Sequence, residues 1–252
     1  MKKSRPRPRL QRHLAARFSP TATFGLHLTV GFVLMLLAAA VFGVIAADVV
    51  AGRPITLLDV ELAHWLHRPA HDGFTRTMLV VTHLHSQPGI TVLALLLGAY
   101  FYRRRAHYWL LTLAAAVPGG MLLNVVLKYT FRRARPEFTD PLLSLSTYSF
   151  PSGHTVGATV LYGVLAAWLV CGSRSWPRRV LVVAAACAMV ALVGLSRMVL
   201  GVHYLSDVLA GVAEGAAWLA ICITAGATLR RRAARNGASN AARSDPPNGE
   251  TP

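Results

Sequence analysis

The fold is decided by the stretch SRMVLGVHYLSDVLAGVAEGAAWLAICITAGATL, residues 196–229. Its second part, Leu205–Leu229, is a mostly apolar run of the length that crosses a bilayer as an α-helix. Its first part places Arg197, His203 and Asp207 at the border of that run. Ionisable groups at membrane depth are costly and usually face a partner or a water-filled cavity. The stretch therefore predicts a membrane helix with a functional site at its start.

Five further apolar runs precede this one. They are Phe24–Val50, Thr77–Tyr102, Tyr108–Leu127, Thr155–Cys171 and Val180–Leu195. Because 54% of the 252 residues are hydrophobic and only 14% are charged, we expect an all-α, polytopic membrane protein with six transmembrane helices. The Gln87-Pro88-Gly89 break interrupts the second run, and Pro88 is expected to kink that helix.

Basic segments flank the apolar region. We expect residues 1–23 to form a basic arm, residues 24–229 the membrane domain, and residues 230–252 a basic, disordered tail. Most Lys and Arg residues lie in these termini and in two loops on the same side of the membrane. The positive-inside rule then puts both termini in the cytoplasm and the active site on the outer face of the cytoplasmic membrane. The net charge of +16 therefore reflects topology, and we expect no nucleic-acid partner.

Two more polar segments lie on the side of the membrane where the opening stretch begins. They are KYTFRRARP, residues 128–136, and PSGH, residues 151–154. Hydrolysis of a phosphate ester gathers negative charge on oxygen, so catalysis depends on fixed cations and N–H donors. Lys128, Arg135 and Arg197 can supply those cations, and the two arginines can bind phosphate oxygens with both arms.

The PSGH segment is predicted to begin a helix and to bind an anion there. Ser152 is a favoured N-cap residue, and Gly153 allows the backbone to approach a phosphate closely. The free N–H groups and the dipole at a helix N-terminus attract negative charge. Ser152 and Gly153 are therefore predicted to bind the phosphate.

The two histidines of the motifs are predicted to divide the catalytic work. His203 and Asp207 are four residues apart, so on a helix they share one face and the carboxylate can orient the imidazole. This makes His203 the better nucleophile. His154 is then the general acid that protonates the leaving oxygen.

The three segments resemble the motifs K-x6-R-P, P-S-G-H and S-R-x5-H-x3-D of the type 2 phosphatidic acid phosphatase family, which vanadium haloperoxidases share. Every motif position matches, and the resemblance covers about residues 77–229. It implies a bacterial membrane phosphatase that uses no cofactor and forms a phosphohistidine at His203. The substrate would be a lipid phosphate or diphosphate in the bilayer. Undecaprenyl diphosphate ranks first, with phosphatidylglycerol phosphate and phosphatidic acid as alternatives.

The small number of acidic residues in the motif loops argues against a metal-dependent mechanism. A two-metal phosphatase needs several clustered carboxylates, but the motif loops contain only Glu137, Asp140 and Asp207. Three other functions stay open: phosphoryl transfer to a lipid or sugar acceptor, a vanadate-dependent haloperoxidase, and a non-enzymatic binder or transporter of lipid phosphates. Six membrane spans speak against the haloperoxidase, and the presence of both histidines speaks against binding alone.

Other polar residues receive no firm role. His83 and His85 are two residues apart, so they point to different sides of a helix and make a poor metal pair. Glu214 is expected about 10 Å deeper in the membrane than Asp207, outside the site. Arg132 and Arg133 either contact phosphate or form a solvated loop. The segment Ile55–Leu66 is expected to form an amphipathic helix near the site.

Overall fold

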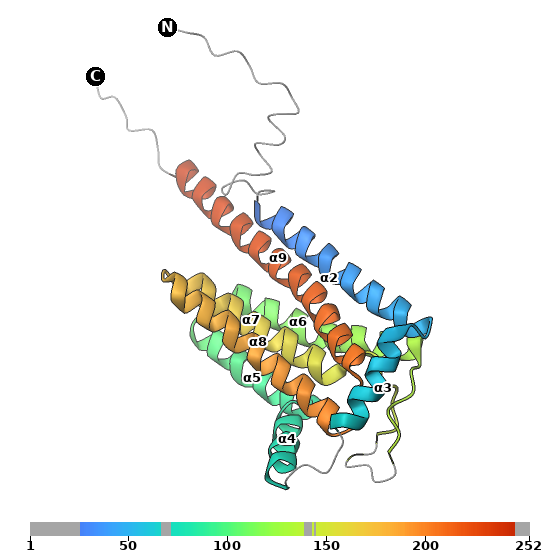
Figure 1. The fold of residues 1–252 in the computed structure, drawn as a ribbon. Helices are drawn as coiled ribbons and strands as arrows, with labels where there is room; N and C mark the ends of the chain where they lie inside the picture. The colour runs from blue at the N-terminus through green and yellow to red at the C-terminus, as the bar shows by residue number, and fades with distance from the viewer. Residues whose placement is uncertain (1–25, 67–71, 139–142, 144, 245–252) are drawn as a thin grey trace, which may run out of the picture.

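The computed structural model describes residues 26–66, 72–138, 143 and 145–244, and these contain helices and loops but no strand. The helices are α2 (Leu26–Val50), α3 (Pro54–Leu66), α4 (Asp72–Leu84), α5 (Gln87–Arg103), α6 (His107–Phe131), α7 (Gly153–Gly172), α8 (Trp176–Val199) and α9 (Leu205–Ser244) (Figure 1). The prediction of an all-α protein is confirmed.

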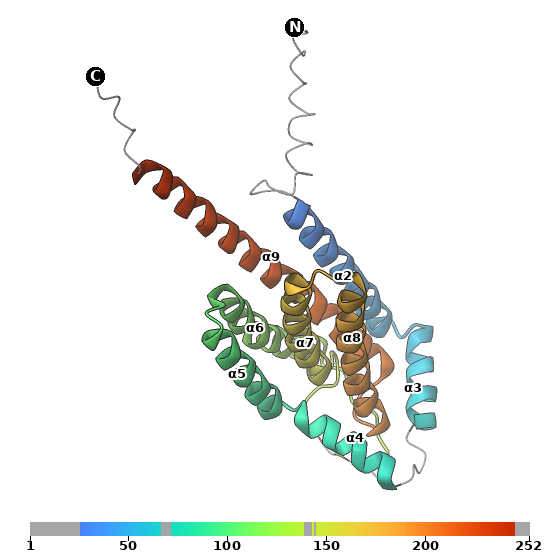
Figure 2. The same ribbon diagram turned by 90° about the vertical axis from the view of Figure 1, so that its left-hand side faces the viewer.

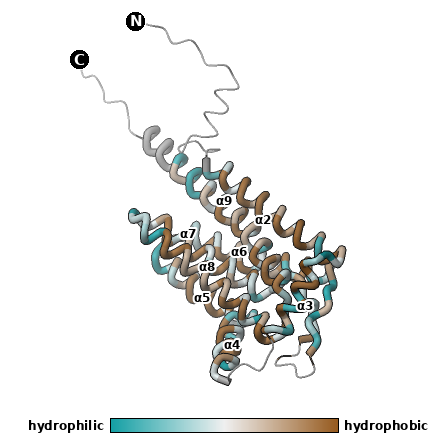
Figure 3. The backbone as a smooth tube through the Cα atoms, in the orientation of Figure 1, coloured by the Kyte–Doolittle hydropathy of each residue, from teal (hydrophilic) through white to brown (hydrophobic). Residues whose placement is uncertain are grey.

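Five described helices, α2, α6, α7, α8 and α9, are long and apolar enough to cross a membrane. The helices α4 and α5 pass the same test as a pair, although they are bent by 59° at the break between them. Counting this pair as one broken span gives the six that the sequence predicted. Apolar residues cover most of the length of these helices (Figure 3).

The break between α4 and α5 arises from local sequence. The Ser86 side chain accepts a hydrogen bond from the Gly89 N–H at 3.4 Å and so caps a new helix. Pro88 lies in the first turn of that helix, where its missing N–H costs nothing. A Cβ atom on Gly89 would lie 2.2 Å from the Leu84 carbonyl oxygen, so this turn requires glycine. The expected kink at Pro88 is therefore a complete restart of the helix.

The helices bring the three motif segments to one end of the bundle. The long helices α2 and α9 lie side by side, and α9 also packs against α6 and α7 (Figures 1 and 2). Two glycines of α9 allow this close contact: a Cβ on Gly211 would lie 2.7 Å from the Ser152 carbonyl oxygen, and one on Gly215 would lie 2.8 Å from Thr159 Cβ. The ends of α6 and α8 therefore meet the starts of α7 and α9, beside α3 and α4.

Two further expectations concern the segment Ile55–Leu66 and the C-terminal residues from 230 onward. The segment Ile55–Leu66 is helical, as α3. The expectation of disorder from residue 230 is wrong for residues 230–244, because α9 continues to Ser244. Alanine and arginine are among the best helix formers and are frequent there, which favours continuation of the helix. The predicted arm, residues 1–23, and residues 245–252 lie outside the described residues.

Candidate active site

His203 and Asp207 are in contact, but not for the reason that the sequence suggested. His203 precedes α9, which begins at Leu205, so the pair does not share a helix face. Instead, Asp207 lies in the first turn and its Oδ2 accepts a hydrogen bond from the Tyr204 N–H at 3.0 Å, a helix-capping contact. The same Oδ2 lies 3.2 Å from His203 Nδ1. The cap of α9 therefore fixes the carboxylate that orients the imidazole.

The environment of His203 favours a neutral imidazole. Its side chain is 2% exposed, and burial holds the pKa of His203 well below the usual 6.5, with Lys128, Arg197 and Arg135 acting in the same direction. The hydrogen-bond pattern assigns a proton on Nδ1, donated to Asp207, and a lone pair on Nε2. Nε2 lies 3.3 Å from Arg135 Nη1. A neutral ring in this tautomer has the nucleophilic nitrogen facing the cations.

Arg135 and Lys128 are held mainly by backbone carbonyl groups of the loops before α7 and α9. Arg135 Nε donates to the Thr147 carbonyl oxygen at 2.7 Å, and its Nη1 donates to the Val202 carbonyl oxygen at 2.7 Å. Lys128 Nζ donates to the carbonyl oxygens of Tyr148 and Ser149 at 2.7 and 3.0 Å. These carbonyls leave one Lys128 N–H for a further acceptor. Burial lowers the pKa of Arg135, although Asp207 opposes the shift.

Arg197 is the cation with the fewest partners. Its side chain is almost fully buried, and Nη1 donates to the Thr82 hydroxyl on α4. Nε is buried and has no hydrogen-bond partner among the described residues. A buried guanidinium with an unpaired N–H carries a large desolvation cost unless an anion occupies the site. Arg197 is therefore the clearest candidate ligand for a phosphate oxygen.

The contacts of the PSGH segment differ from those that the sequence predicted. Ser152 is at the N-cap of α7, but its hydroxyl makes no capping bond and instead accepts one from Thr155 at 3.0 Å. The Ser152 N–H donates to the Asp207 carbonyl oxygen at 3.0 Å, so it is not available to an anion. The N–H groups of Gly153 and His154, at the start of the helix, have no partner in the described part of the chain. The N–H groups that are free to bind an anion are therefore those of Gly153 and His154.

His154 begins α7 within reach of the other motif residues. Its imidazole is partly exposed and lies close enough to Arg197, His203 and Arg135 for their charges to act on it. The structure thus brings all the predicted site residues to one place: His203, His154, Asp207, Lys128, Arg135, Gly153, Ser152 and Arg197.

An ion-pair network behind Asp207 was missed by the sequence analysis. Arg133 Nη1 donates to Asp207 Oδ1 at 2.7 Å, and Nη2 donates to Asp59 Oδ2 at 2.8 Å. Asp59 and Asp207 are both fully buried, and Ser206 donates to Asp59 through its N–H and its hydroxyl. Burial alone would lower the pKa of Arg133, but Asp207 and Asp59 raise it above its usual value. Of the two interpretations considered for Arg133, phosphate contact or solvated loop, neither fits, because both arms of this arginine form ion pairs with buried carboxylates.

Glu214 lies below the site, in contact with a second buried polar residue. Asn124 Nδ2 donates to Glu214 Oε2 at 3.0 Å and lies 3.3 Å from the Pro151 carbonyl oxygen. A Cβ on Gly153 would lie 2.9 Å from Asn124 Oδ1, so this amide forms part of the support under the PSGH turn. Glu214 touches none of the predicted catalytic side chains, in agreement with the expectation that it lies deeper.

His83 and His85 have ordinary roles in the fold. His83 Nδ1 bonds to the Leu79 carbonyl oxygen at 2.7 Å. His85 Nε2 lies 2.7 Å from the Tyr162 hydroxyl and links the turn after α4 to α7. Within the described residues, no group of three or more His, Cys, Asp or Glu side chains is placed to hold a metal ion. Asp140, one of the three acidic residues considered in the motif loops, lies outside the described residues.

A polar cavity of about 490 Å³ opens beside the site. Its lining includes Arg133, Arg135, Glu137, Tyr148 and Val202, which come from the loops before α7 and α9. Arg135 lines this cavity and also lies 3.3 Å from His203 Nε2, so the cavity adjoins the candidate site. The arrangement contains a nucleophile, its orienting carboxylate, fixed cations and helix N–H donors, which together suit phosphoryl transfer.

Comparison with known proteins supports this chemistry. The family model described as PAP2 superfamily matches residues 108–231. Phosphatidylglycerophosphatase B of Bacillus subtilis is 38% identical over 146 residues, which cover 55% of this chain and 68% of that protein. Decaprenylphosphoryl-5-phosphoribose phosphatase of Mycobacterium tuberculosis is 36% identical over 146 residues, which cover 57% of this chain and 75% of that protein.

Two solved structures share the fold. The crystal structure of a transmembrane PAP2 type phosphatidylglycerolphosphate phosphatase from Bacillus subtilis matches with a TM-score of 0.67 and 30% identity, over 75% of this chain and 94% of that one. Aquifex aeolicus LpxE matches with a TM-score of 0.54 and 23% identity, over 66% of this chain and 94% of that one. The second likeness concerns the fold alone.

Proposed function

The chain belongs to the PAP2 superfamily, and we propose that it is a membrane phosphatase that hydrolyses a lipid phosphate or diphosphate through a phosphohistidine at His203. The observation that carries the proposal is the pairing of a buried, incompletely bonded Arg197 with a buried His203 that Asp207 orients. A cation without a full set of partners beside a neutral nucleophile suits an anionic substrate that is attacked at phosphorus.

The first half of the reaction transfers the phosphoryl group to the enzyme. Nε2 of His203 attacks phosphorus while the bond from phosphorus to the lipid oxygen breaks. His154 donates a proton to that leaving oxygen, and Asp207 stabilises the positive imidazole ring that results. Lys128, Arg135 and Arg197, with the N–H groups of Gly153 and His154, hold the phosphate oxygens.

The second half returns the enzyme to its starting state. Water attacks phosphorus on the side away from His203 and gives its proton to His154, now the general base. The bond from phosphorus to Nε2 breaks, and inorganic phosphate leaves. Transfer to a lipid or sugar acceptor would follow the same path, with an acceptor hydroxyl in place of water.

We propose that this reaction needs no metal ion. Its charge stabilisation comes from three cationic side chains, and Asp59 and Asp207, two buried carboxylates near the site, are both engaged in ion pairs with Arg133. A carboxylate so engaged is a poor ligand for a second cation.

Release of phosphate from a lipid panel tests the proposed activity. Purified protein in detergent is expected to release inorganic phosphate from undecaprenyl diphosphate, phosphatidylglycerol phosphate or phosphatidic acid, with full activity in the presence of a strong chelator. The first of these substrates is our preferred one, since an outward-facing site suits recycling of a carrier lipid. Loss of activity in chelator, restored by a divalent metal, would contradict the metal-free mechanism. Label moving from substrate to an acceptor, without free phosphate, would identify a transferase.

The membrane orientation is also part of the proposal: the site faces outward from the cytoplasmic membrane. In a background without Cys171, Cys187 and Cys222, Glu137→Cys would report on the motif end of the bundle and Arg174→Cys on the opposite end. A membrane-impermeant maleimide added to spheroplasts is expected to label only Glu137→Cys. Labelling of Arg174→Cys alone would show that the protein has the opposite orientation, with the site facing the cytoplasm.

A further inference from the structure

Glu214 is a buried acidic residue to which the proposed reaction assigns no role. The helices α6, α7, α8 and α9 contain two acidic residues, Asp207 and Glu214, and Asp207 is paired with Arg133. Glu214 is 3% exposed, and in the described part of the chain no cationic group forms an ion pair with it. Its Oε1 is buried and has no hydrogen-bond partner there. A carboxyl group so placed is costly to desolvate, and ionisable groups at membrane depth usually serve a function.

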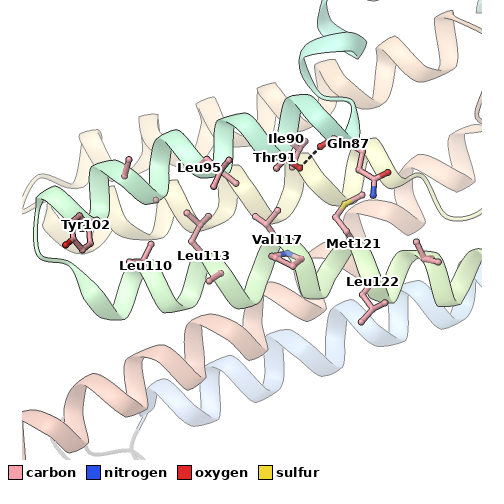
Figure 4. A pocket seen from close by; sticks show the side chains of 16 residues that line it. Gln87, Ile90, Thr91, Leu95, Tyr102, Leu110, Leu113, Val117, Met121 and Leu122 are labelled. Carbon is pink, nitrogen blue, oxygen red and sulfur yellow. Dashed lines mark hydrogen bonds between the residues drawn. The ribbon is translucent and has the colours of Figure 1, made fainter.

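The face of α6 toward α5 is apolar at this level. It lines an apolar groove of about 800 Å³, which Figure 4 shows from close by. The α6 side chains labelled in that view are Leu110, Leu113, Val117, Met121 and Leu122. Asn124 does not line this groove: it is 2% exposed and bonds to α9 and to the loop before α7. The Asn124 amide is thus turned toward Glu214 and the candidate site.

The Asn124 side chain connects Glu214 to the PSGH turn. Its Nδ2 donates to Glu214 Oε2 at 3.0 Å and to the Pro151 carbonyl oxygen at 3.3 Å, so both N–H bonds of the amide are used. Its Oδ1 is then turned toward Gly153, where an added Cβ would lie only 2.9 Å away. Because the Glu214 oxygen accepts a hydrogen bond, it fixes which side of the amide faces the turn. A change at Glu214 therefore shifts Gly153 through the amide, without direct contact.

The groups next to this contact are those proposed to hold the phosphate. Gly153 and His154 carry the N–H groups that are free to bind an anion. Lys128 follows Asn124 by one turn of α6, and its Cε lies 3.9 Å from a Cβ placed on Gly153. Glu214 and Lys128 are also close enough for their charges to interact. The two residues therefore support the phosphate-binding groups from the side of the membrane interior.

We infer that Asn124 and Glu214 are positioning residues of the phosphate site. Glu214 orients the Asn124 amide, and the amide holds the PSGH turn where the N–H groups of Gly153 and His154 meet the phosphate oxygens. Neither positioning residue touches the substrate. The inference rests on the proposed phosphatase function and adds two residues to the site that performs it. It implies that Glu214 lowers the stability of the fold while it raises the rate of the reaction.

Glu214→Met separates this role from a structural one, because stability and activity should change in opposite directions. Methionine has a similar length and no ionisable group to desolvate, so the melting temperature in detergent should stay the same or rise. The Asn124 amide loses its acceptor. Orthovanadate, a phosphate analogue, should therefore bind the intact protein about tenfold more weakly in isothermal titration calorimetry. The kcat for phosphatidic acid should fall by about tenfold or more, with KM less affected.

Two further variants test the path from Glu214 to the turn. Glu214→Gln keeps a side-chain oxygen that accepts from Asn124, so orthovanadate affinity and kcat should stay within about twofold of wild type. Asn124→Leu removes the amide and should cost at least as much activity as Glu214→Met. The double variant that combines Asn124→Leu with Glu214→Met should be no worse than Asn124→Leu alone, because both changes break the same path.

Trp218→Phe is the matched control. Trp218 Nε1 donates to the Ala115 carbonyl oxygen at 3.3 Å, so it also joins α9 to α6, one turn beyond Glu214. Its loss should lower the melting temperature and leave orthovanadate affinity and kcat within about twofold of wild type. The inference is overturned if Glu214→Met keeps wild-type affinity and kcat, if Trp218→Phe loses as much activity, or if activity falls only together with the melting temperature.

The two readouts also separate this inference from the proposed function. Wild-type protein that binds orthovanadate but hydrolyses no lipid phosphate would refute the function, while the binding series would still decide the role of Asn124 and Glu214. Wild-type protein that hydrolyses lipid phosphates, with kcat unchanged in Glu214→Met, would refute the positioning role alone. Protein that neither binds orthovanadate nor hydrolyses any lipid phosphate would refute both.

Discussion

Replacing His203 with alanine is expected to lower kcat by roughly four orders of magnitude or more, as loss of a catalytic nucleophile does in other enzymes that form covalent intermediates. The imidazole is almost completely buried beside Asp207 and Arg135, so no other side chain can take its position. Phosphate release from the preferred lipid, measured with detergent-purified protein, gives the rate. The melting temperature, measured in parallel, shows whether the variant folds.

Replacement of the two histidines should differ in how strongly its effect depends on the leaving group of the substrate. His154→Ala removes the proton donor, so its effect should shrink for a substrate whose leaving group needs no proton, such as p-nitrophenyl phosphate. His203→Ala should be equally inactive on both substrates. A His203→Ala enzyme that retains a tenth of the wild-type rate, or about that, would contradict the assignment of the nucleophile.

Replacing Arg133 with glutamine is expected to have the largest effect on stability. Arg133 is the shared partner of two fully buried carboxylates, Asp59 and Asp207. Breaking a buried pair by removal of one partner costs about 3–5 kcal/mol, because the remaining charge is left without compensation. Here two charges lose their partner. The apparent melting temperature in detergent should fall by roughly 10 °C or more.

The same change should also slow the reaction, since Arg133 holds the carboxylate that orients His203. A displacement of about 1 Å in a catalytic group can cost on the order of a hundredfold in rate. Arg133→Lys should recover little of the lost stability or rate, because one ammonium group cannot bond both carboxylates in the planar, two-armed manner of a guanidinium.

The neighbouring arginine supplies the control for this prediction. Arg132 is exposed, and its Nε donates to the Tyr129 carbonyl oxygen, so Arg132→Gln should change neither the melting temperature nor kcat appreciably. Asp59→Asn combined with Arg133→Gln should be less damaging than the sum of the single changes, because it removes opposite charges together. If Arg133→Gln and Arg132→Gln behave alike, the network has no part in positioning Asp207.

The spans and the motif residues were accessible to sequence reasoning for simple physical reasons. Length and apolar composition decide whether a helix can cross a bilayer, and both are local properties. The motifs carry their own spacing, so Lys128, Arg135 and His203 are recognisable from the amino-acid sequence alone. Their shared location followed from topology, since each lies at the same end of its span.

The supporting contacts were less accessible, because they join segments far apart in the chain. Arg133 and Asp59 are 74 residues apart, and Asn124 and Glu214 are 90 residues apart. The sequence did indicate that one residue of each pair would be buried. Asp59 lies on the same face of α3 as the buried Ala63, and Glu214 interrupts an apolar run. Each of these two carboxylates needs a partner when it is buried, but the sequence alone does not identify that partner.

The PSGH turn shows a different limit of the sequence. Ser152 has the residue type of an N-cap, but its N–H is taken by the Asp207 carbonyl oxygen. That contact depends on how closely α9 packs against α7, which Gly211 permits. Because of this helix packing, the N–H groups left free to bind an anion are those of Gly153 and His154, one residue later than the sequence predicted.

Direct detection of the phosphoenzyme would show whether His203 carries the phosphoryl group. The protein is mixed with a phosphate-labelled lipid, denatured within milliseconds at alkaline pH, where phosphohistidine survives, and analysed by peptide mass spectrometry. We expect one labelled residue, His203, with label appearing before free phosphate, retained in Arg132→Gln and absent in His203→Ala. Label on another residue, or a single turnover that releases phosphate with no labelled protein at any time, would contradict it.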